Sequence, residues 1–170
     1  MAQTIAGNGH EAMPQPGPDT AQRLIVNAQY IKDLSFENPR APQSLTQQAA
    51  APNVDINVDV NAQPLNPETY EVVLTINANA KINNEALFIL ELTYGAVVTI
   101  RNVPRDMLPS VLLVETPRLM FPFARAIVAD ATQNGGFPPL MINPIDFTEL
   151  LRRNAEQAGT LPADQTPSGD

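Results

Sequence analysis

The chain has 170 residues, of which 44 % are hydrophobic, 5 % are aromatic and none is cysteine. Its 18 acidic and 10 basic residues give a net charge of −8, which argues against nucleic-acid binding, because that function gathers Lys and Arg. The lack of cysteine excludes a disulfide framework and a thiolate metal site, and no apolar run reaches the ~20 residues of a membrane span.

The composition along the chain predicts one domain between two tails. Residues 1–21 are rich in Gly, Pro, Gln and Asn without any period, which predicts a disordered N-terminal tail. This tail has no basic start followed by an apolar core, so it does not resemble a signal peptide. Residues 22–157 carry the periodic patterns of a folded domain, and residues 158–170 predict a disordered acidic tail.

The first predicted strand covers residues 22–37 and is bent or interrupted, because its pattern is irregular. Near its end, alternation places Leu34 and Phe36 on one face. Asp33 and Glu37 fall on the other face.

Three further strands follow. Residues 54–60 alternate Val or Ile with Asp or Asn, the pattern of one buried and one solvated face. Residues 70–80 and 86–93 predict two more strands, with a possible break at Tyr94-Gly95. A hairpin turn at Ile82-Asn83-Asn84-Glu85 joins these two, since Asn tolerates positive φ.

The second half of the domain predicts helices. Residues 105–114 indicate a short amphipathic helix that Pro109 interrupts. A longer helix is expected to begin with Thr116 as N-cap and to stop at Gly135. A last helix begins near Asn143 and runs to about residue 157.

The long helix has one odd feature and one clear stripe. Pro122 lies inside it, where a proline removes a backbone donor at a cost of about 3 kcal/mol. Every fourth position is apolar, which predicts a face that covers the sheet. The residues of this stripe are Leu119, Phe123, Ile127 and Ala131.

Strands followed by helices indicate an α+β fold, a four-stranded antiparallel sheet covered on one face by helices. The other face would then carry many carboxylates and few cations, with Lys32 and Lys81 nearby and Ile89 among them. The carboxylates of this predicted outer face are Asp33, Glu37, Asp55, Asp59, Glu71 and Glu91. Such a face can dock a basic partner, and the alternative interpretation is a face that only solubilises the protein.

Little in the sequence suggests catalysis, so no enzyme, cofactor or metal site is predicted. The single histidine, His10, lies in the N-terminal tail and cannot serve a buried acid–base site. Asp55 and Asp59 are about 13 Å apart along one strand, too far to share an ion.

Several segments together resemble the SecB family of protein-export chaperones. They are residues 30–42 (YIKDLSFENPRAP), 70–74 (YEVVL), 119–125 (LMFPFAR), 135–140 (GGFPPL) and 143–147 (NPIDF). Their order and spacing agree with the family over roughly residues 22–157. The resemblance implies a cytoplasmic homotetramer, a dimer of dimers, that holds preproteins unfolded and passes them to the SecA motor without using nucleotide.

The resemblance also implies where partners bind. In the family, a basic, zinc-bearing tail of SecA contacts the exposed sheet face, and the matching residues here are Asp33, Glu37, Ile89 and Glu91. Clients bind apolar grooves between the sheet, the loop after the first strand and the long helix. The candidates for client contact are Leu45, Phe121, Phe123 and Phe137, although such phenylalanines are often plain core.

This chain departs from the family at one place. Residues 43–51 hold Leu45 as their only large apolar side chain, whereas the family loop carries aromatics that include a tryptophan. Two functions therefore stay open: a general holdase for exported preproteins, and an adaptor of the same fold dedicated to one partner such as an antitoxin.

Overall fold

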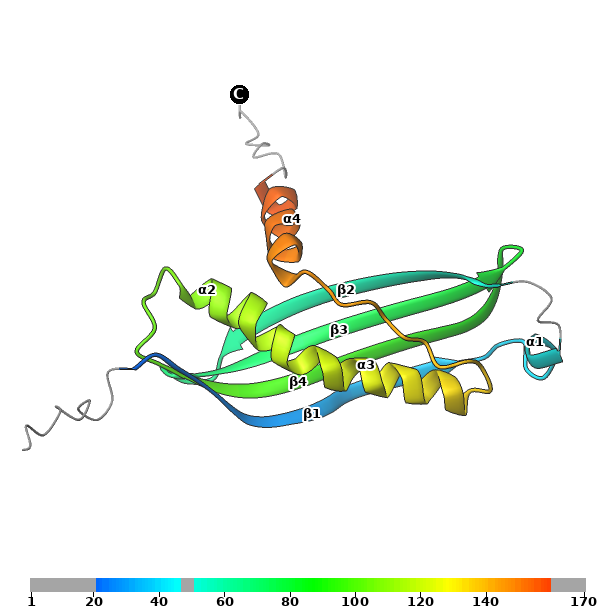
Figure 1. The fold of residues 1–170 in the computed structure, drawn as a ribbon, viewed down its shortest axis with the longest axis horizontal. Helices are drawn as coiled ribbons and strands as arrows, with labels where there is room; N and C mark the ends of the chain where they lie inside the picture. The colour runs from blue at the N-terminus through cyan, green and yellow to red at the C-terminus, as the bar shows by residue number, and fades with distance from the viewer. Residues whose placement is uncertain (1–20, 47–50, 160–170) are drawn as a thin grey trace, which may run out of the picture.

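The computed structural model describes residues 21–46 and 51–159, so the predicted tails lie almost wholly outside it. Its four strands form one antiparallel sheet in the order β1-β4-β3-β2. The strands are β1 (Arg23–Glu37), β2 (Asn53–Pro64), β3 (Thr69–Ile82) and β4 (Glu85–Arg101). The predicted four-stranded sheet is confirmed (Figure 1).

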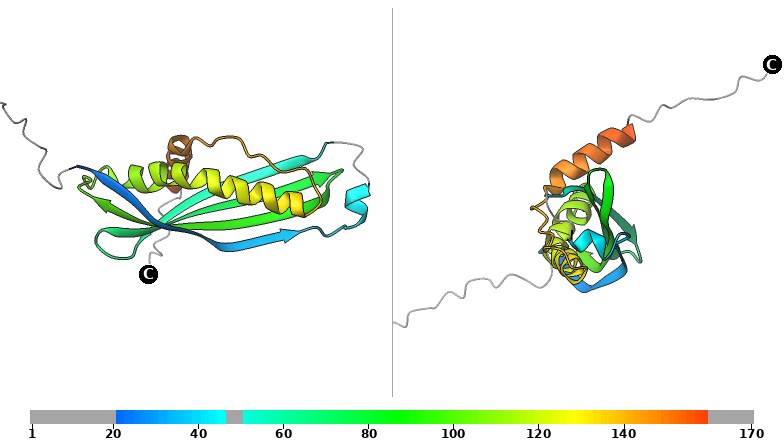
Figure 2. Two further views of the ribbon diagram at one scale, coloured as in Figure 1. Left: turned by 60° about the horizontal axis from the view of Figure 1, so that its bottom comes forward. Right: turned by 90° about the vertical axis from the view of Figure 1, so that its right-hand side faces the viewer.

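The helices lie on one face of this sheet and leave the other open (Figures 1 and 2). They are α1 (Gln43–Thr46), α2 (Leu108–Ser110), the π-helical turn η1 (Val111–Glu115), α3 (Thr116–Asn134) and α4 (Phe147–Gly159). Helix α3 runs along the sheet, whereas α4 points away beyond the β2 side (Figure 1). We call the open side of the sheet the outer face. No helix in the described residues is long and apolar enough to cross a membrane.

Strand β1 contains two register shifts, which explain its irregular sequence. The first lies between Val26 and Ala28 and the second between Ile31 and Asp33, each leaving one extra residue against β4. A bulge of this kind reverses which residues point to each face. The strand predicted to be bent or interrupted is therefore one continuous strand with two bulges.

The hairpin between β3 and β4 forms as predicted. Asn83 and Asn84 have φ angles of 51° and 64°, the left-handed values that a tight two-residue turn requires. Beyond it, β4 continues to Arg101 without the break that Tyr94-Gly95 suggested. Gly95 serves a different purpose, because a Cβ there would lie 2.7 Å from the ring of Tyr30.

Thr116 is not a helix N-cap, which corrects the predicted helix boundary. The backbone is helical from Leu108 through Asn134, because η1 joins α2 to α3. Thr116 is buried, and its hydroxyl donates to the carbonyl of Val111 at 2.9 Å. Pro122 therefore lies in the interior of a long helical run, where its side chain is exposed.

The predicted sheet-facing stripe of α3 is only partly correct, because Ile127 and Ala131 pack against the core whereas its first two members do not. Leu119 and Phe123 are 49 % and 54 % exposed. The adjacent stripe packs on the sheet instead, and its fully buried members are Met120, Ala124, Val128 and Thr132. Both stripes have the same four-residue spacing, so periodicity alone could not choose between them. The structure leaves the stripe of Leu119 and Phe123 uncovered in one chain.

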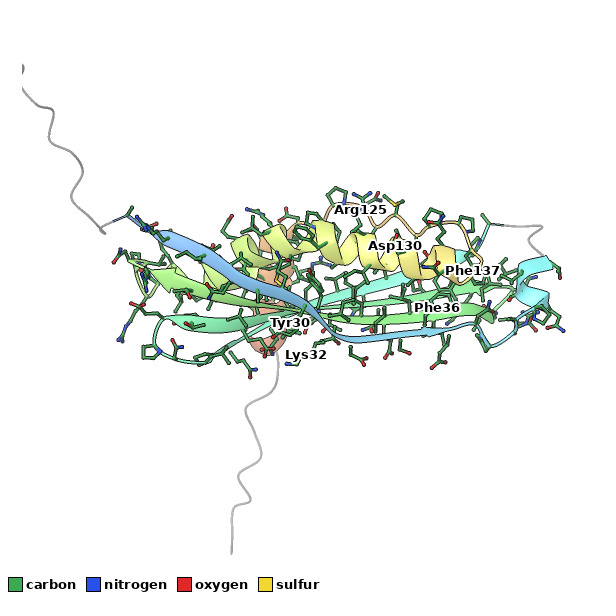
Figure 3. The ribbon with its side chains drawn as sticks, turned by 90° about the horizontal axis from the view of Figure 1, so that it is seen from below. Tyr30, Lys32, Phe36, Arg125, Asp130 and Phe137 are labelled. Carbon is green, nitrogen blue, oxygen red and sulfur yellow. The ribbon has the colours of Figure 1, made fainter. Side chains whose placement is uncertain are left out.

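Two ring clusters connect the helices to the sheet. Phe88 lies 5.6 Å from Phe36 and 5.0 Å from Phe137 between ring centroids, which joins the end of β1 and the start of β4 to the segment after α3. Figure 3 labels Phe36 and Phe137 at this end of the molecule. Phe121 and Phe147 meet edge to face at 6.0 Å and join α3 to α4. These contacts fix the helical layer on the inner face and do not involve the outer face.

Candidate functional site: the acidic outer face of the sheet

The four residues matched to a partner site lie together on the outer face. Glu37 is opposite Ile89 across the β1–β4 pair, and Asp33 is four residues from Glu37 along β1, on the same face. Glu91 lies on β4 opposite Ser35, which is midway between Asp33 and Glu37. Asp33, Glu37 and Glu91 are exposed, and Ile89 is partly exposed between them.

The second bulge of β1 is what brings Asp33 to this face. Before it, Tyr30 lies opposite Gly95 on the outer side and Ile31 opposite Tyr94 on the helix side. Lys32 is the extra residue, so Asp33 rather than Lys32 lies opposite Thr93 on the outer side. Bulges commonly re-aim side chains in this way next to functional sites.

Among the residues that the structure describes, none forms an ion pair or side-chain hydrogen bond with Asp33, Glu37 or Glu91. Three unpaired acids around one hydrophobic side chain form a surface that attracts a cationic segment.

A shallow hollow of about 270 Å³ extends the site toward β2. Asparagines and acids line it together with Ile89, and they are Asp55, Asn57, Asn77, Asn79 and Glu91. The side-chain oxygen of Asn79 is buried and accepts no hydrogen bond in the described structure. The asparagines and carboxylates give this hollow a polar lining around Ile89. Of these residues, the sequence predicted a solvated face for Asp55 and Asn57.

Glu71 behaves differently from the other acids, which corrects its predicted projection into solvent. It is on the outer face but only 6 % exposed. Lys32 Nζ lies 2.9 Å and 3.1 Å from its two carboxylate oxygens. Tyr30 and Gln63 also donate hydrogen bonds to this carboxylate.

The electrostatics of this cluster follow from those contacts. The hydrogen bond from Tyr30, followed by that from Lys32, lowers the pKa of Glu71 to about 2. The same bond to Glu71 raises the pKa of Tyr30 to about 12. Tyr30 reaches across β4 because Gly95 has no side chain beneath the ring. Figure 3 shows Tyr30 and Lys32 on the side of the sheet away from α3.

The structure divides the four candidates for client contact. Leu45 and Phe123 are 40 % and 54 % exposed, whereas Phe121 and Phe137 are 7 % and 6 % exposed. The buried pair fills the two ring clusters, so neither offers open surface in this structure. Only Leu45 and Phe123 are placed to touch another molecule directly.

Two apolar grooves that the sequence did not reveal lie along β2. One of about 410 Å³ lies between β2 and the start of the helical run, lined by Val60, Ala62, Leu108, Leu112 and Leu113. The other, of about 310 Å³, lies beside α4 and includes Ile56, Ile145 and Leu150. Their residues come from distant segments, so no local motif could have predicted them.

Comparisons with known proteins agree with this architecture. The family model described as preprotein translocase subunit SecB matches residues 18–158. The protein-export protein SecB of Rhodospirillum centenum is 46 % identical over 161 residues, covering 94 % of this chain and 96 % of that protein. The protein of the same name from a Bradyrhizobium species is 49 % identical over 162 residues, with 95 % and 99 % coverage.

A solved structure shares the fold at much lower identity. It is a SecB-like chaperone of Mycobacterium tuberculosis in complex with a peptide from an antitoxin, and its TM-score with this chain is 0.61. The two are 15 % identical, with 72 % of this chain and 91 % of that chain covered. At this identity the likeness supports the fold alone.

Proposed function

The chain belongs to the SecB family and is a protein-export chaperone, and from this premise we propose that its acidic outer face is the docking surface for the SecA motor. The observation that carries the proposal is the group of unpaired acids, Asp33, Glu37 and Glu91, around Ile89. Negative charge steers a basic partner to this face, and Ile89 adds an apolar contact. The partner segment would be the basic, zinc-bearing tail of SecA.

Client binding uses the other side of the molecule in this proposal. Leu45, Phe123 and the grooves beside β2 expose apolar surface near the helical layer. Apolar contacts of this kind hold unfolded segments with little sequence specificity. Because clients and SecA then occupy opposite faces, a loaded chaperone can still dock on the motor.

The uncovered stripe of α3 supports assembly into a homotetramer, a dimer of dimers. Leu119 lies outside the core of one chain and is 49 % exposed, one turn before Phe123, which this proposal leaves to clients. A helix with apolar side chains beyond its sheet-facing stripe gains stability by packing against another helix. We place this assembly in the cytoplasm, where preproteins emerge before export.

The proposed activity needs no chemical step. A holdase acts by mass action, because it binds the unfolded state of its client and slows folding. The dedicated-adaptor alternative gains no support from the comparisons, because the 46 % and 49 % identical relatives are export proteins and the antitoxin-bound neighbour is 15 % identical.

The test is a charge reversal at the centre of the outer face. Glu91→Lys is expected to abolish SecA binding while the suppression of aggregation of an unfolded preprotein survives. Glu68→Lys is the matched control, since Glu68 is an exposed acid that pairs with Arg101 at the opposite end of the sheet. The proposal is wrong if Glu91→Lys leaves SecA affinity equal to that of the control.

A further inference from the structure

Lys32, which contacts Glu71, is the extra residue of the β1 bulge that places Asp33 on the outer face. Lys32 and Asp33 are adjacent, and both reach the outer face: Asp33 lies opposite Thr93, and Lys32 contacts Glu71. Without another partner, an ammonium group beside an exposed carboxylate would pair with it and reduce its charge. The arrangement therefore raises the question of what keeps Asp33 unpaired.

Glu71 supplies the answer through its geometry. Both of its oxygens contact the Lys32 ammonium, at 2.9 Å and 3.1 Å, while the lysine side chain stays half-exposed. Tyr30 and Gln63 donate to the same carboxylate and hold it in place. The Tyr30 ring lies over Gly95 and shields Glu71 from solvent on that side. A fixed carboxylate competes well for a flexible lysine, because less side-chain entropy remains to be lost.

We propose that Glu71 is a positioning residue for the outer face: it holds Lys32 away from Asp33 and so leaves Asp33 free for a basic partner. The inference rests on the proposed docking of SecA at this face. It assigns to the Tyr30–Lys32–Glu71–Gln63 cluster a role in partner affinity besides its role in folding. Glu71 itself does not touch the partner, because it is buried.

The inference predicts a rescue that a purely structural role does not. Glu71→Gln keeps an acceptor for Tyr30 but releases Lys32, so affinity for purified SecA is expected to fall about fivefold, the scale of one surface ion pair. Adding Lys32→Met removes the released cation and is expected to restore affinity to within about twofold of the parent chain. The double variant also returns the net charge to the parent value of −8.

The experiment measures SecA affinity by calorimetry for the full chain and its variants. Glu68→Gln is the charge-matched control, because it also removes one carboxylate but lies away from Lys32, paired with Arg101. Thermal unfolding of each variant shows that the compared proteins are folded. Weak binding by Glu71→Gln with recovery in the double variant supports the inference.

Two results overturn it, and a third identifies a failure of the underlying function. Unchanged affinity of Glu71→Gln means that Lys32 does not compete for Asp33. Equal weakening in the single and double variants means that Glu71 acts only through the fold. Unchanged affinity of Glu91→Lys in the same series means that SecA docks elsewhere, and the inference falls with the proposed function.

Discussion

Gly95→Ala tests whether the Tyr30 side chain, which reaches over Gly95 on β4 to Glu71, stabilises the folded chain. A Cβ at this position would lie 2.7 Å from two carbons of the Tyr30 ring and 3.0 Å from its hydroxyl oxygen. Ordinary carbon contacts are 3.5–4.0 Å, so the ring would have to move by about 1 Å. That movement breaks the hydrogen bond from Tyr30 to Glu71.

The expected cost has two parts. Overpacking costs about 1–3 kcal/mol, and losing a hydrogen bond to a charged group costs about 1.5–3 kcal/mol. Because the two overlap at one side chain, we expect a total loss of about 3 kcal/mol in the free energy of unfolding. The midpoint of thermal unfolding would then fall by roughly 6 to 12 °C.

A double-mutant cycle separates this mechanism from a general intolerance of β4 to alanine. In a Tyr30→Ala background the ring is absent, so adding Gly95→Ala is expected to cost under about 0.5 kcal/mol, measured by urea unfolding at one protein concentration. If Gly95→Ala costs the same with and without the Tyr30 ring, the reasoning is refuted.

Two further predictions concern acid stability and assembly. The pKa of Glu71, about 2 in the folded chain against an ordinary 4.5, means that its stabilising contribution is present above pH 4.5 and is lost as the pH falls toward 2. Urea unfolding at several pH values is therefore expected to show the stability difference between the parent and Glu71→Gln shrinking across that window, and a constant difference would contradict the assignment. Leu119→Asp, at an exposed position, is expected to leave the circular dichroism unchanged but to reduce the mass found by sedimentation, and an unchanged mass would remove α3 from the interface.

Local patterns predicted most of the sheet well, because the alternation in β2, β3 and β4 shows which face of each strand is apolar. The β2 alternation and the two asparagines of the hairpin both have direct physical meaning, and both predictions hold. The placement of Ile89 and Glu91 on one face followed from the same period of two.

Features of the outer face that depend on contacts between distant segments could not be predicted from the sequence. Glu71 has the period of an exposed residue, but Tyr30 reaches it over Gly95 from a strand two positions away in the sheet. The sequence shows Tyr30, Gly95 and Glu71 far apart, so only the strand order brings them together. The bulge at Lys32 was likewise hidden, because one extra residue shows only as an irregular alternation.

The prediction of which stripe of α3 packs on the sheet was partly wrong for a related reason. Leu119 and Met120 are both apolar, as are Phe123 and Ala124, so two neighbouring stripes satisfied the helical period. Packing on the sheet selected the stripe with Met120 and Ala124. On the other stripe, Leu119 is the residue that the proposed assembly would cover, and a single sequence cannot distinguish such a residue from core.

The most direct test of the central claim is the affinity of SecA for the Glu91→Lys chain, compared with its capacity to hold an unfolded preprotein. Reversing a charge that faces a basic partner is expected to abolish measurable SecA binding, a loss of at least about 30-fold in affinity, with preprotein aggregation still suppressed as in the parent chain. SecA binding that matches the parent, or a parallel loss of preprotein holding, would contradict the assignment of the two activities to opposite faces of the sheet.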